Sequence, residues 1–438
     1  MIDLVLSLLL AAGPGPLQLK DCIREALQRH PEVALSAQDV ARARAERHGS
    51  RSGYLPRIDL TIQDGYSIWG AQEHIYGSGG DPIKYTQPGG DDDTHSFGLR
   101  LYQNILDGGK WWTRIERADR EIDRTRLAVE ATREDVALRV IVAYYTLVES
   151  RQELEVLRQA LEASREHLRL ARERKRLGAA SRVDVAKARV SVGEDRMQVE
   201  YKLRAVAKAR VDLNLAMGRP AGAALAVVDV SPEGIEVPAS GGQGSLDEHA
   251  RLRALEAARE VAALDASMAR ADHWPRVAGS ISYSRNDPEF YKVYSRFDQL
   301  YRLTFMLTIS FPVFDGFATS SRVEQAEVAA ERVRLEQDRV ALDLQGDLAR
   351  AQSDLHHLAE VAAVEDDNIR AAGQQLELAE ESYRLGQGTA LELRDAQLAV
   401  TRARIAAVKT RFEIMIALAG YHHARGDLLA TYLPGEHP

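Results

Sequence analysis

The chain has 438 residues and a formal net charge of −8, with 28% charged and 6% aromatic residues. This acidic balance lacks the basic surface that nucleic acids require, so we expect no nucleic-acid partner. The single cysteine, Cys22, excludes an intrachain disulfide and is expected to be a small buried hydrophobic residue in a helix. A composition rich in Ala, Arg, Leu and Glu is typical of long helices rather than of a compact mixed fold.

The first residues resemble a secretory signal. Leu4 to Ala12 form a short apolar run that ends at Ala11-Ala12-Gly13, as at a cleavage site, although Met1-Ile2-Asp3 carries no positive charge. We therefore expect residues 1–13 to be a signal peptide and the protein to be exported. No uncharged apolar stretch of about 20 residues follows, so no membrane-spanning helix is expected. A crossing of the membrane would have to use strands.

Two halves of the chain repeat the same order of elements: a helix, a pair of strands and a long helical hairpin. Arg176-Leu177-Gly178 recurs as Arg384-Leu385-Gly386, and Asp107-Gly108 recurs as Asp315-Gly316, each at a shift of 208 (386 − 178 and 316 − 108). A duplication of this length predicts two similar structural units. The first repeat is predicted at 17–220, with strands at 54–69 and 96–106 and a helical hairpin at 108–217. A linker or equatorial region at 221–245 separates it from the second repeat at 246–421, which has strands at 277–284 and 301–314 and a hairpin at 317–421. A C-terminal tail is predicted at 422–438.

The hairpin helices are too long for a compact domain to cover. The pattern that follows Gly109 continues to Leu177, nearly 70 residues, which is roughly 105 Å of helix. In the return helices apolar residues recur at every seventh position, which predicts side-by-side packing with coiled-coil geometry. These positions are Val185, Val192, Val199, Val206 and Leu213 in the first half and Leu393, Val400, Ala407, Ile414 and Tyr421 in the second.

The predicted strands alternate between apolar and polar residues, most clearly from Leu303 to Val313. The Gly- and Asp-rich stretch 70–95 and the polar stretch 285–299 are expected to be exposed loops on the outer side. A sheet with one apolar and one polar face is typical of a transmembrane barrel with a wet lumen. Four strands cannot close a barrel, so we predict that three chains contribute about twelve. The alternative, a soluble sheet with one buried face, lacks an element to cover that face.

With these features the chain resembles the TolC-type outer membrane efflux family. The resemblance rests on Leu55-Pro56-Arg57, residues 104–109, their counterparts Trp274-Pro275-Arg276 and 312–316, and above all on 383–393 followed by Asp395-Ala396-Gln397. It implies a mainly α protein with a duplicated half-repeat, in which long periplasmic coiled-coil helices form a tunnel and four strands per chain build a trimeric outer membrane β-barrel. It also implies a passive exit duct for tripartite efflux or type I secretion. Its partners would be a periplasmic adaptor (membrane fusion) protein, an inner membrane transporter and outer membrane lipid, and it would need no cofactor.

The same resemblance implies a closing iris beside the two helix-to-helix turns. The matching acids are Asp184 in the first turn and Glu392 and Asp395 in the second, and Tyr383 matches a tyrosine that helps to latch the closed state. Threefold symmetry would arrange each acid in a ring that favours cations, and one like-charge pair at ~6 Å costs roughly 3 kcal/mol at an effective dielectric of ~20. Gly388 departs from the family, whose best-known members have a basic latch residue there, so the closing network is expected to be built differently.

The turns themselves are, by the resemblance, the docking surface for the adaptor. These residues are Arg176, Leu177, Gly178, Ser181, Arg384, Leu385, Gly386 and Thr389. A second interpretation of Asp184, Glu392 and Asp395 needs no gate, because acids near Ser181 and Thr389 also compensate the positive charge of helix N-termini.

No motif of an enzyme class is present, and we expect no catalytic activity. The pairs His356-His357 and His422-His423 lack ligands to complete a metal site and are expected to be solvent-exposed. Trp111 and Trp112 fit an aromatic girdle at the membrane interface and simple packing equally well. Two other functions compete with the duct. A soluble coiled-coil scaffold without a pore has no use for the apolar strand face, and a periplasmic adaptor has one helical hairpin rather than two.

Overall fold

The computed structural model describes residues 16–76, 83–178, 180–230, 246–295 and 297–435. The predicted signal peptide at 1–13 and residues 231–245 of the predicted linker lie outside these ranges. The chain divides into two units. The helical unit comprises Met1–Val40, Arg124–Glu256 and Leu335–Pro438, and the sheet unit comprises Ala41–Asp123 and Ala257–Arg334.

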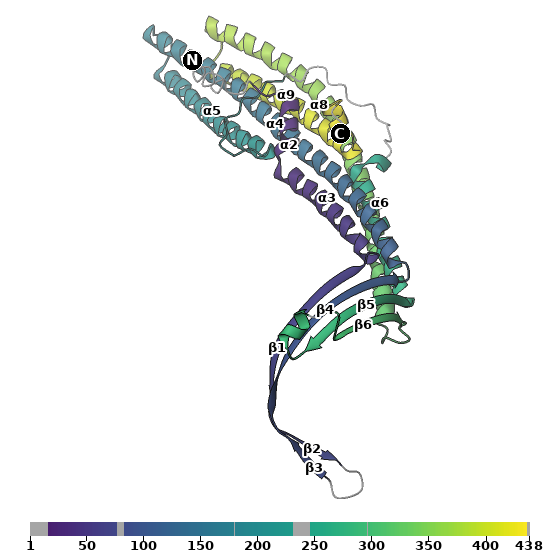
Figure 1. The fold of residues 1–438 in the computed structure, drawn as a ribbon. Helices are drawn as coiled ribbons and strands as arrows, with labels where there is room; N and C mark the ends of the chain where they lie inside the picture. The colour runs from purple at the N-terminus through teal and green to yellow at the C-terminus, as the bar shows by residue number, and fades with distance from the viewer. Residues whose placement is uncertain (1–15, 77–82, 179, 231–245, 296, 436–438) are drawn as a thin grey trace, which may run out of the picture. The chain divides into compact units, whose positions relative to one another are not determined.

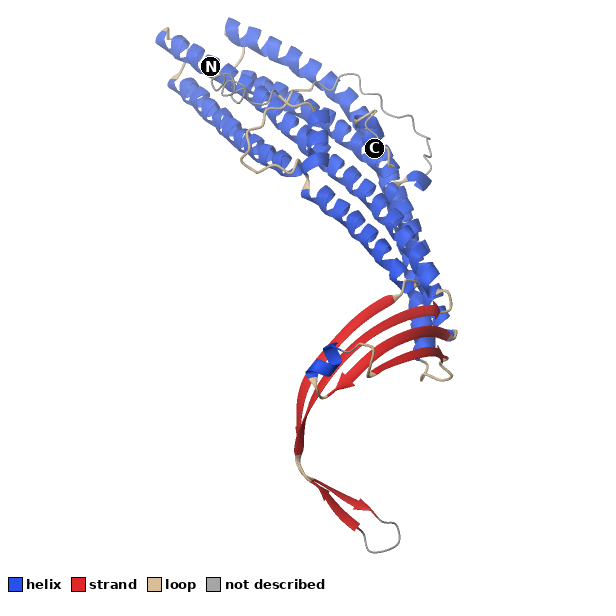
Figure 2. Cartoon of the chain, in the orientation of Figure 1, coloured by secondary structure: helices blue, strands red, loops and turns tan. Residues whose placement is uncertain are grey.

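The described chain is mainly helical with two sheets, which confirms the predicted fold class (Figures 1 and 2). The helices are α2 (Leu19–Arg29), α3 (Pro31–Ser50), α4 (Lys110–Arg176), α5 (Arg182–Ala216), α6 (Ala250–Arg270), α7 (Phe290–Ser295), α8 (Ala318–Leu385), α9 (Ala390–Arg425) and α10 (Leu428–Tyr432). The strands are β1 (Arg57–Trp69), β2 (Gln72–Tyr76), β3 (Ile83–Gln87), β4 (Gly90–Leu106), β5 (Arg276–Asp287) and β6 (Tyr301–Ser310).

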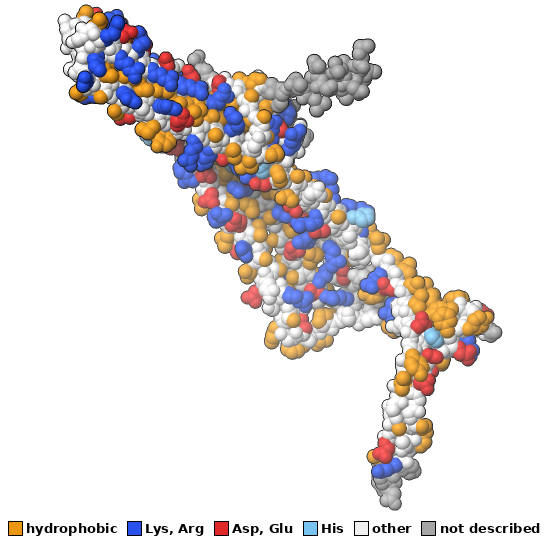
Figure 3. Space-filling model, turned by 90° about the vertical axis from the view of Figure 1, so that its left-hand side faces the viewer, with side chains coloured by type: hydrophobic (Ala, Val, Ile, Leu, Met, Phe, Trp, Pro, Cys, Tyr) orange, Lys and Arg blue, Asp and Glu red, His pale blue; other side chains and the backbone are white. Residues whose placement is uncertain are grey.

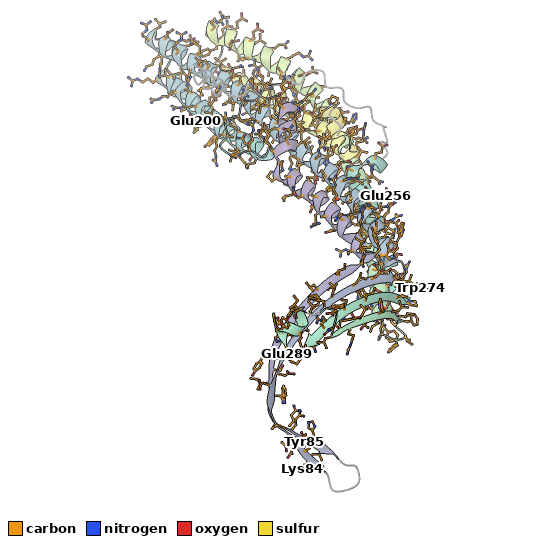
Figure 4. All side chains as sticks on the ribbon, viewed as in Figure 1. Lys84, Tyr85, Glu200, Glu256, Trp274 and Glu289 are labelled. Carbon is orange, nitrogen blue, oxygen red and sulfur yellow. The ribbon has the colours of Figure 1, made fainter. Side chains whose placement is uncertain are left out.

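The sheet unit contains a four-stranded antiparallel sheet with the order β1-β4-β5-β6. The register aligns an apolar row, Leu60, Leu99, Tyr283 and Leu303, beside a polar row, Asp59, Arg100, Ser282 and Thr304. Because side chains alternate between the two faces of a sheet, one face is apolar and the other polar. The apolar face is largely uncovered within the chain, and Phe305 on it is 71% exposed. Trp274 and Glu289 mark the two ends of β5 in Figure 4.

Two segments predicted to be loops contain regular structure. Within 70–95, β2 and β3 form a hairpin, and β4 begins at Gly90 rather than at 96. Asp91 pairs there with Ile68 of β1, so main-chain hydrogen bonding outweighs the low strand propensity of aspartate. Within 285–299, α7 contacts β4 and β5. The guanidinium of Arg285 is buried and donates to the Lys292 carbonyl of α7 at 2.6 Å.

Glycines with positive φ close both helical hairpins. Helices α4 and α8 have 67 and 68 residues, and the return helices α5 and α9 have 35 and 36. Gly178 and Gly386 follow the long helices with φ of +79° and +77°, a conformation that glycine adopts without steric cost. The two turns are therefore alike in backbone geometry as well as in sequence.

The predicted seven-residue stripes are packed, as expected for helices lying side by side. Val199, Val206 and Leu213 of α5 are buried, together with Leu393, Val400, Ala407, Ile414 and Tyr421 of α9. Val185 and Val192 are partly buried against α4. The polar faces of the helices have Lys, Arg, Asp and Glu side chains intermingled (Figure 3).

The main core of the helical unit forms where α2, α4, α5 and α9 meet. It includes Ile23, Tyr144, Leu213 and Phe412, each fully buried. Cys22 is also fully buried there, which confirms the prediction for this residue, and burial raises the pKa of its thiol to about 12.

The predicted C-terminal tail at 422–438 is instead structured as far as Tyr432. Helix α9 continues to Arg425 and ends at Gly426, which has φ of +80°. Helix α10 follows and buries Leu428 completely in the main core. Residues 422–433 are ordered because their apolar side chains join that core. Among the described residues, no helix combines the length and the apolar character that a bilayer crossing requires.

Gly218 is a direct test of the packing between α5 and the loop from α2 to α3. Its φ is +72°, and a Cβ atom would lie 3.0 Å from the Cα of His30 and 3.2 Å from the carbonyl oxygen of Arg29. We expect Gly218→Ala to destabilise the protein by about 2 kcal/mol and to lower its thermal unfolding midpoint by several degrees. Gly222→Ala is the matched control, since a Cβ there meets nothing within 4 Å. Equal midpoints for the two variants would contradict this packing.

Candidate functional site

The two helix-to-helix turns of the helical unit have the same cap. The Ser181 hydroxyl accepts from the Asp184 N–H at 3.2 Å, and the Asp184 carboxylate accepts from the Ser181 N–H at 2.9 Å. Thr389 and Glu392 repeat this arrangement at 3.2 and 2.8 Å. These reciprocal hydrogen bonds are capping boxes. The bonds from Ser181 lower the pKa of Asp184 below its ordinary value. Two of the three predicted gate acids are therefore engaged in helix capping.

Asp395 differs from the other two acids. It lies on α9 three residues after Glu392 and is exposed. Its carboxylate has no hydrogen bond or ion pair within the part of the chain that the structure describes. Among the three predicted gate acids, Asp395 is thus the one whose carboxylate no described residue engages.

The residues of the predicted docking turns are all exposed: Arg176, Leu177, Gly178, Ser181, Arg384, Leu385, Gly386 and Thr389. The two leucines occupy equivalent positions after the long helices, and their side chains are 75% and 64% exposed. Burial of such large apolar side chains is favourable, so each turn offers an apolar contact at its tip.

Tyr383 links the second hairpin to the first. It is buried, and the guanidinium of Arg174 on α4 lies 4.7 Å from the centre of its ring. Arg174 Nη1 also donates to the Tyr383 carbonyl at 3.1 Å. The His167 ring lies 5.2 Å from the tyrosine ring, between centroids. A cation over an aromatic face together with a hydrogen bond gives a directional contact between α4 and α8.

A cavity of about 460 Å³ adjoins Tyr383 among α4, α8 and α9. His167, Leu170 and Leu393 contribute to its lining. Burial, and then the charges of Arg394 and Arg174, lower the pKa of His167. The imidazole is therefore neutral at neutral pH, and its Nε2 is buried without a hydrogen-bond partner in the described structure.

A buried ion pair links α9 to α5 and α4. Arg394 donates to both carboxylate oxygens of Asp195 at 2.8 Å, and to the Ser164 hydroxyl at 3.2 Å. The Ser164 hydroxyl also donates to Asp195. The side chains of Arg394 and Asp195 are 15% and 10% exposed. A bidentate pair with so little exposure fixes both the distance and the orientation of the helices that hold it.

The histidine pairs have different environments. His356 and His357 are exposed, as predicted. His422 and His423 are not: their side chains lie within 2.9 and 2.8 Å of the Asp427 and Asp135 carboxylates, respectively, because this end of α9 packs into the core. Over the described ranges, no three or more His, Cys, Asp or Glu side chains come together as a metal site would require.

Trp111 packs at 5.5 Å on Tyr54, between ring centroids, whereas Trp112 is 63% exposed.

Sequence reasoning missed the contacts that join the hairpins. It singled out Tyr383 but not Arg174, His167, Arg394 or Asp195. One signal was available. Asp195 lies three residues after Val192 of the apolar stripe, at a seam position where an acid is expected to need a buried cation.

The family model for outer membrane efflux proteins matches residues 22–219 and 242–420, which is most of the chain. The chain belongs to this family. The match includes both halves and confirms the resemblance to TolC-type channels. The protein is accordingly located in the outer membrane, with its helices in the periplasm.

Individual relatives agree with this assignment. Protein CyaE of Bordetella pertussis is 26% identical over 343 residues, 77% of this chain and 69% of its own length. A membrane protein from Pseudomonas aeruginosa has a TM-score of 0.81 at 20% identity, over 93% of this chain and 92% of its own. The outer membrane channel MtrE of Neisseria gonorrhoeae, solved in its open state, has a TM-score of 0.78 at 19% identity, over 94% and 89%. The two solved structures share the fold of this chain.

The Arg394–Asp195 pair generates a stability prediction. Arg394→Leu leaves a buried carboxylate without its cation, so we expect a loss of about 3–5 kcal/mol. The double variant Arg394→Leu/Asp195→Leu should recover much of that loss, since no uncompensated charge remains. The measurement is thermal or denaturant unfolding of the purified protein. Arg402→Leu, an exposed arginine of the same helix, is the control. A cost for Arg394→Leu no greater than that for Arg402→Leu would show that the pair is not buried as described.

Proposed function

We propose that three copies of the chain form a passive duct through the outer membrane, the exit of a tripartite efflux pump or a type I secretion system. The observation that carries this proposal is the uncovered apolar face of the sheet, opposite a polar face. In water such a face is unfavourable by roughly 25 cal/mol per Å² of apolar surface. Lipid removes that penalty, and the polar face is suited to line a wet lumen.

The sheet also supports the number of copies. Its edge strands, β1 and β6, each have one row of main-chain groups that no described residue pairs, and lipid cannot satisfy such groups. Pairing β6 of one copy with β1 of the next satisfies both edges. Because each chain supplies four strands in strict alternation, this pairing continues the antiparallel order. Three copies give about twelve strands, enough for an open channel.

The helical unit supplies the periplasmic part of the proposed duct. Its hairpin turns carry exposed leucines at equivalent positions, Leu177 and Leu385. A periplasmic adaptor would bind there and connect the duct to an inner membrane transporter. The duct itself needs neither a cofactor nor an energy source, and it performs no covalent chemistry.

Opening and closing would occur at the same turns. Asp395 is the strongest gate candidate, because its exposed carboxylate has no local partner in the described structure. Asp184 and Glu392 would add charge to the constriction while capping their helices. Tyr383 with Arg174, and Arg394 with Asp195, would hold the hairpins together in place of the basic residue that Gly388 replaces.

Conductance and oligomeric state test the duct. We expect the protein purified in mild detergent to have the mass of a trimer and to form conducting channels in planar bilayers. Recovery in the aqueous fraction without detergent would support a soluble scaffold instead. A monomer that forms no channels would contradict the proposal.

Paired variants separate the gate role of Glu392 from its capping role. Glu392→Gln keeps the capping box but removes the charge, since glutamine also serves at this position. Glu392→Ala removes both. A gate predicts that Glu392→Gln and Asp395→Asn each reduce cation preference, measured as a shift in reversal potential under a salt gradient. Capping alone predicts a loss of about 1 kcal/mol for Glu392→Ala only. Unchanged selectivity in the double variant Glu392→Gln/Asp395→Asn would rule out the iris.

A further inference from the structure

A second cavity lies in the sheet unit, on the polar face of the strands beside the start of α4. Its volume is about 560 Å³, within the range of small-molecule sites. The strands contribute hydroxyl groups to its lining from Tyr102 of β4, Ser280 of β5 and Thr308 of β6. The register places Tyr102 opposite Ser280 and pairs Ala278 with Thr308. The cavity thus has one wall built from three neighbouring strands.

The charged side chains that line this cavity are mostly basic. Lys110, Arg114 and Arg276 are the cations, and Asp107 is the one acid in the lining. Asp107 is already engaged: it accepts from the Trp111 N–H at 3.3 Å and from the Asn104 side chain at 3.0 Å. Its charge serves the start of α4, so the cavity retains an excess of positive charge.

Asp272, directly beyond the lining, does not remove that excess. This carboxylate is 7% exposed and forms ion pairs with Lys110, Arg276 and Arg322. Its one negative charge is thus shared among three cations. When Asp272 and Arg322 are counted together with the lining residues, they add one charge of each sign, so the net positive charge around the cavity is unchanged. The shared carboxylate does hold Lys110 and Arg276 in place beside the cavity.

Arg114 is the cation of this lining that has no partner among the described residues. It is exposed, and across the described ranges its guanidinium forms no hydrogen bond or ion pair. It lies close to the turn at Gly53, where an added Cβ would be 3.4 Å from Nη1. A guanidinium so placed can donate two parallel hydrogen bonds to a carboxylate or a phosphate.

We propose that this cavity binds a small multivalent oxyanion, a phosphate or a polycarboxylate, with Arg114 as the principal contact. Lys110 and Arg276 would supply further charge, and the hydroxyls of Tyr102, Ser280 and Thr308 would donate to the remaining oxygens. The cavity is lined from the polar face, opposite the apolar one, so the ligand is a soluble anion rather than a lipid headgroup. Anion binding at this cavity does not rest on the proposed duct. The inference that the anion reaches the cavity while passing through the lumen does rest on it.

The test is calorimetric titration of the full-length protein in a non-ionic detergent with inorganic phosphate and with citrate. We expect saturable binding that Arg114→Gln weakens about tenfold or more, as for the loss of a hydrogen bond to a charged group. Arg302→Gln is the matched control, because Arg302 is an exposed arginine of the same polar face that does not line the cavity. A second variant, Ser280→Ala/Thr308→Val, keeps every charge and should weaken binding by a smaller factor.

The outcomes are distinct. Equal phosphate affinity in Arg114→Gln and Arg302→Gln, an absence of saturable binding, or binding of a short-chain phosphatidic acid but not of phosphate would each overturn the site. The unfolding midpoints of the variants show whether a loss of binding is a loss of fold. Because the titration needs no membrane, phosphate binding by a protein that forms no channel would contradict the duct and leave the site standing.

Discussion

The structure depends on one constraint: a sheet with an apolar face on one side and a polar face on the other cannot be stable alone in water. The described residues provide little to cover the apolar face and nothing to pair its outer strands. In the proposed duct, lipid would meet the first requirement and further copies of the chain would meet the second. The fold and the membrane location thus have one physical origin.

Charged side chains join the two hairpins at positions where apolar contacts would be sufficient for stability. Buried ion pairs are weak contributors to stability, since desolvation offsets much of their attraction, but they enforce one geometry. Arg394 with Asp195, and Arg174 over Tyr383, lie at the end of the helices where the hairpins turn. Farther from the turns, the heptad positions are largely apolar, and Lys202 of α5 forms an ion pair with the buried Glu153 of α4. The directional contacts of Arg394 and Arg174 fix the position of the second hairpin relative to the first.

The sequence was most informative where a pattern is repeated. Heptad spacing predicted the buried stripes of α5 and α9, and the recurring Arg-Leu-Gly predicted both turns, because each depends on local periodicity or on the backbone freedom of glycine. The β2–β3 hairpin and the start of β4 were missed, since pairing with β1 imposes strand structure on a Gly- and Asp-rich segment. Arg394 was missed for another reason. Its partner is 199 residues away, a separation that no local pattern encodes. The capping role of Glu392 was foreseen only as an alternative.

The ion pair between Arg394 and Asp195 has no equivalent at the corresponding positions of the other repeat. Shifting each by 208 positions gives Ala186 and Ala403, so the mirror-image contact would join two methyl groups. In the proposed ring of six hairpins from three chains, this charge pair would therefore recur only at the three junctions within chains. In that proposed ring, three junctions would be held by the Arg394–Asp195 pair and the three junctions between chains would not contain this pair. Opening of the ring would then begin at the junctions between chains, and the two hairpins of each chain would move together.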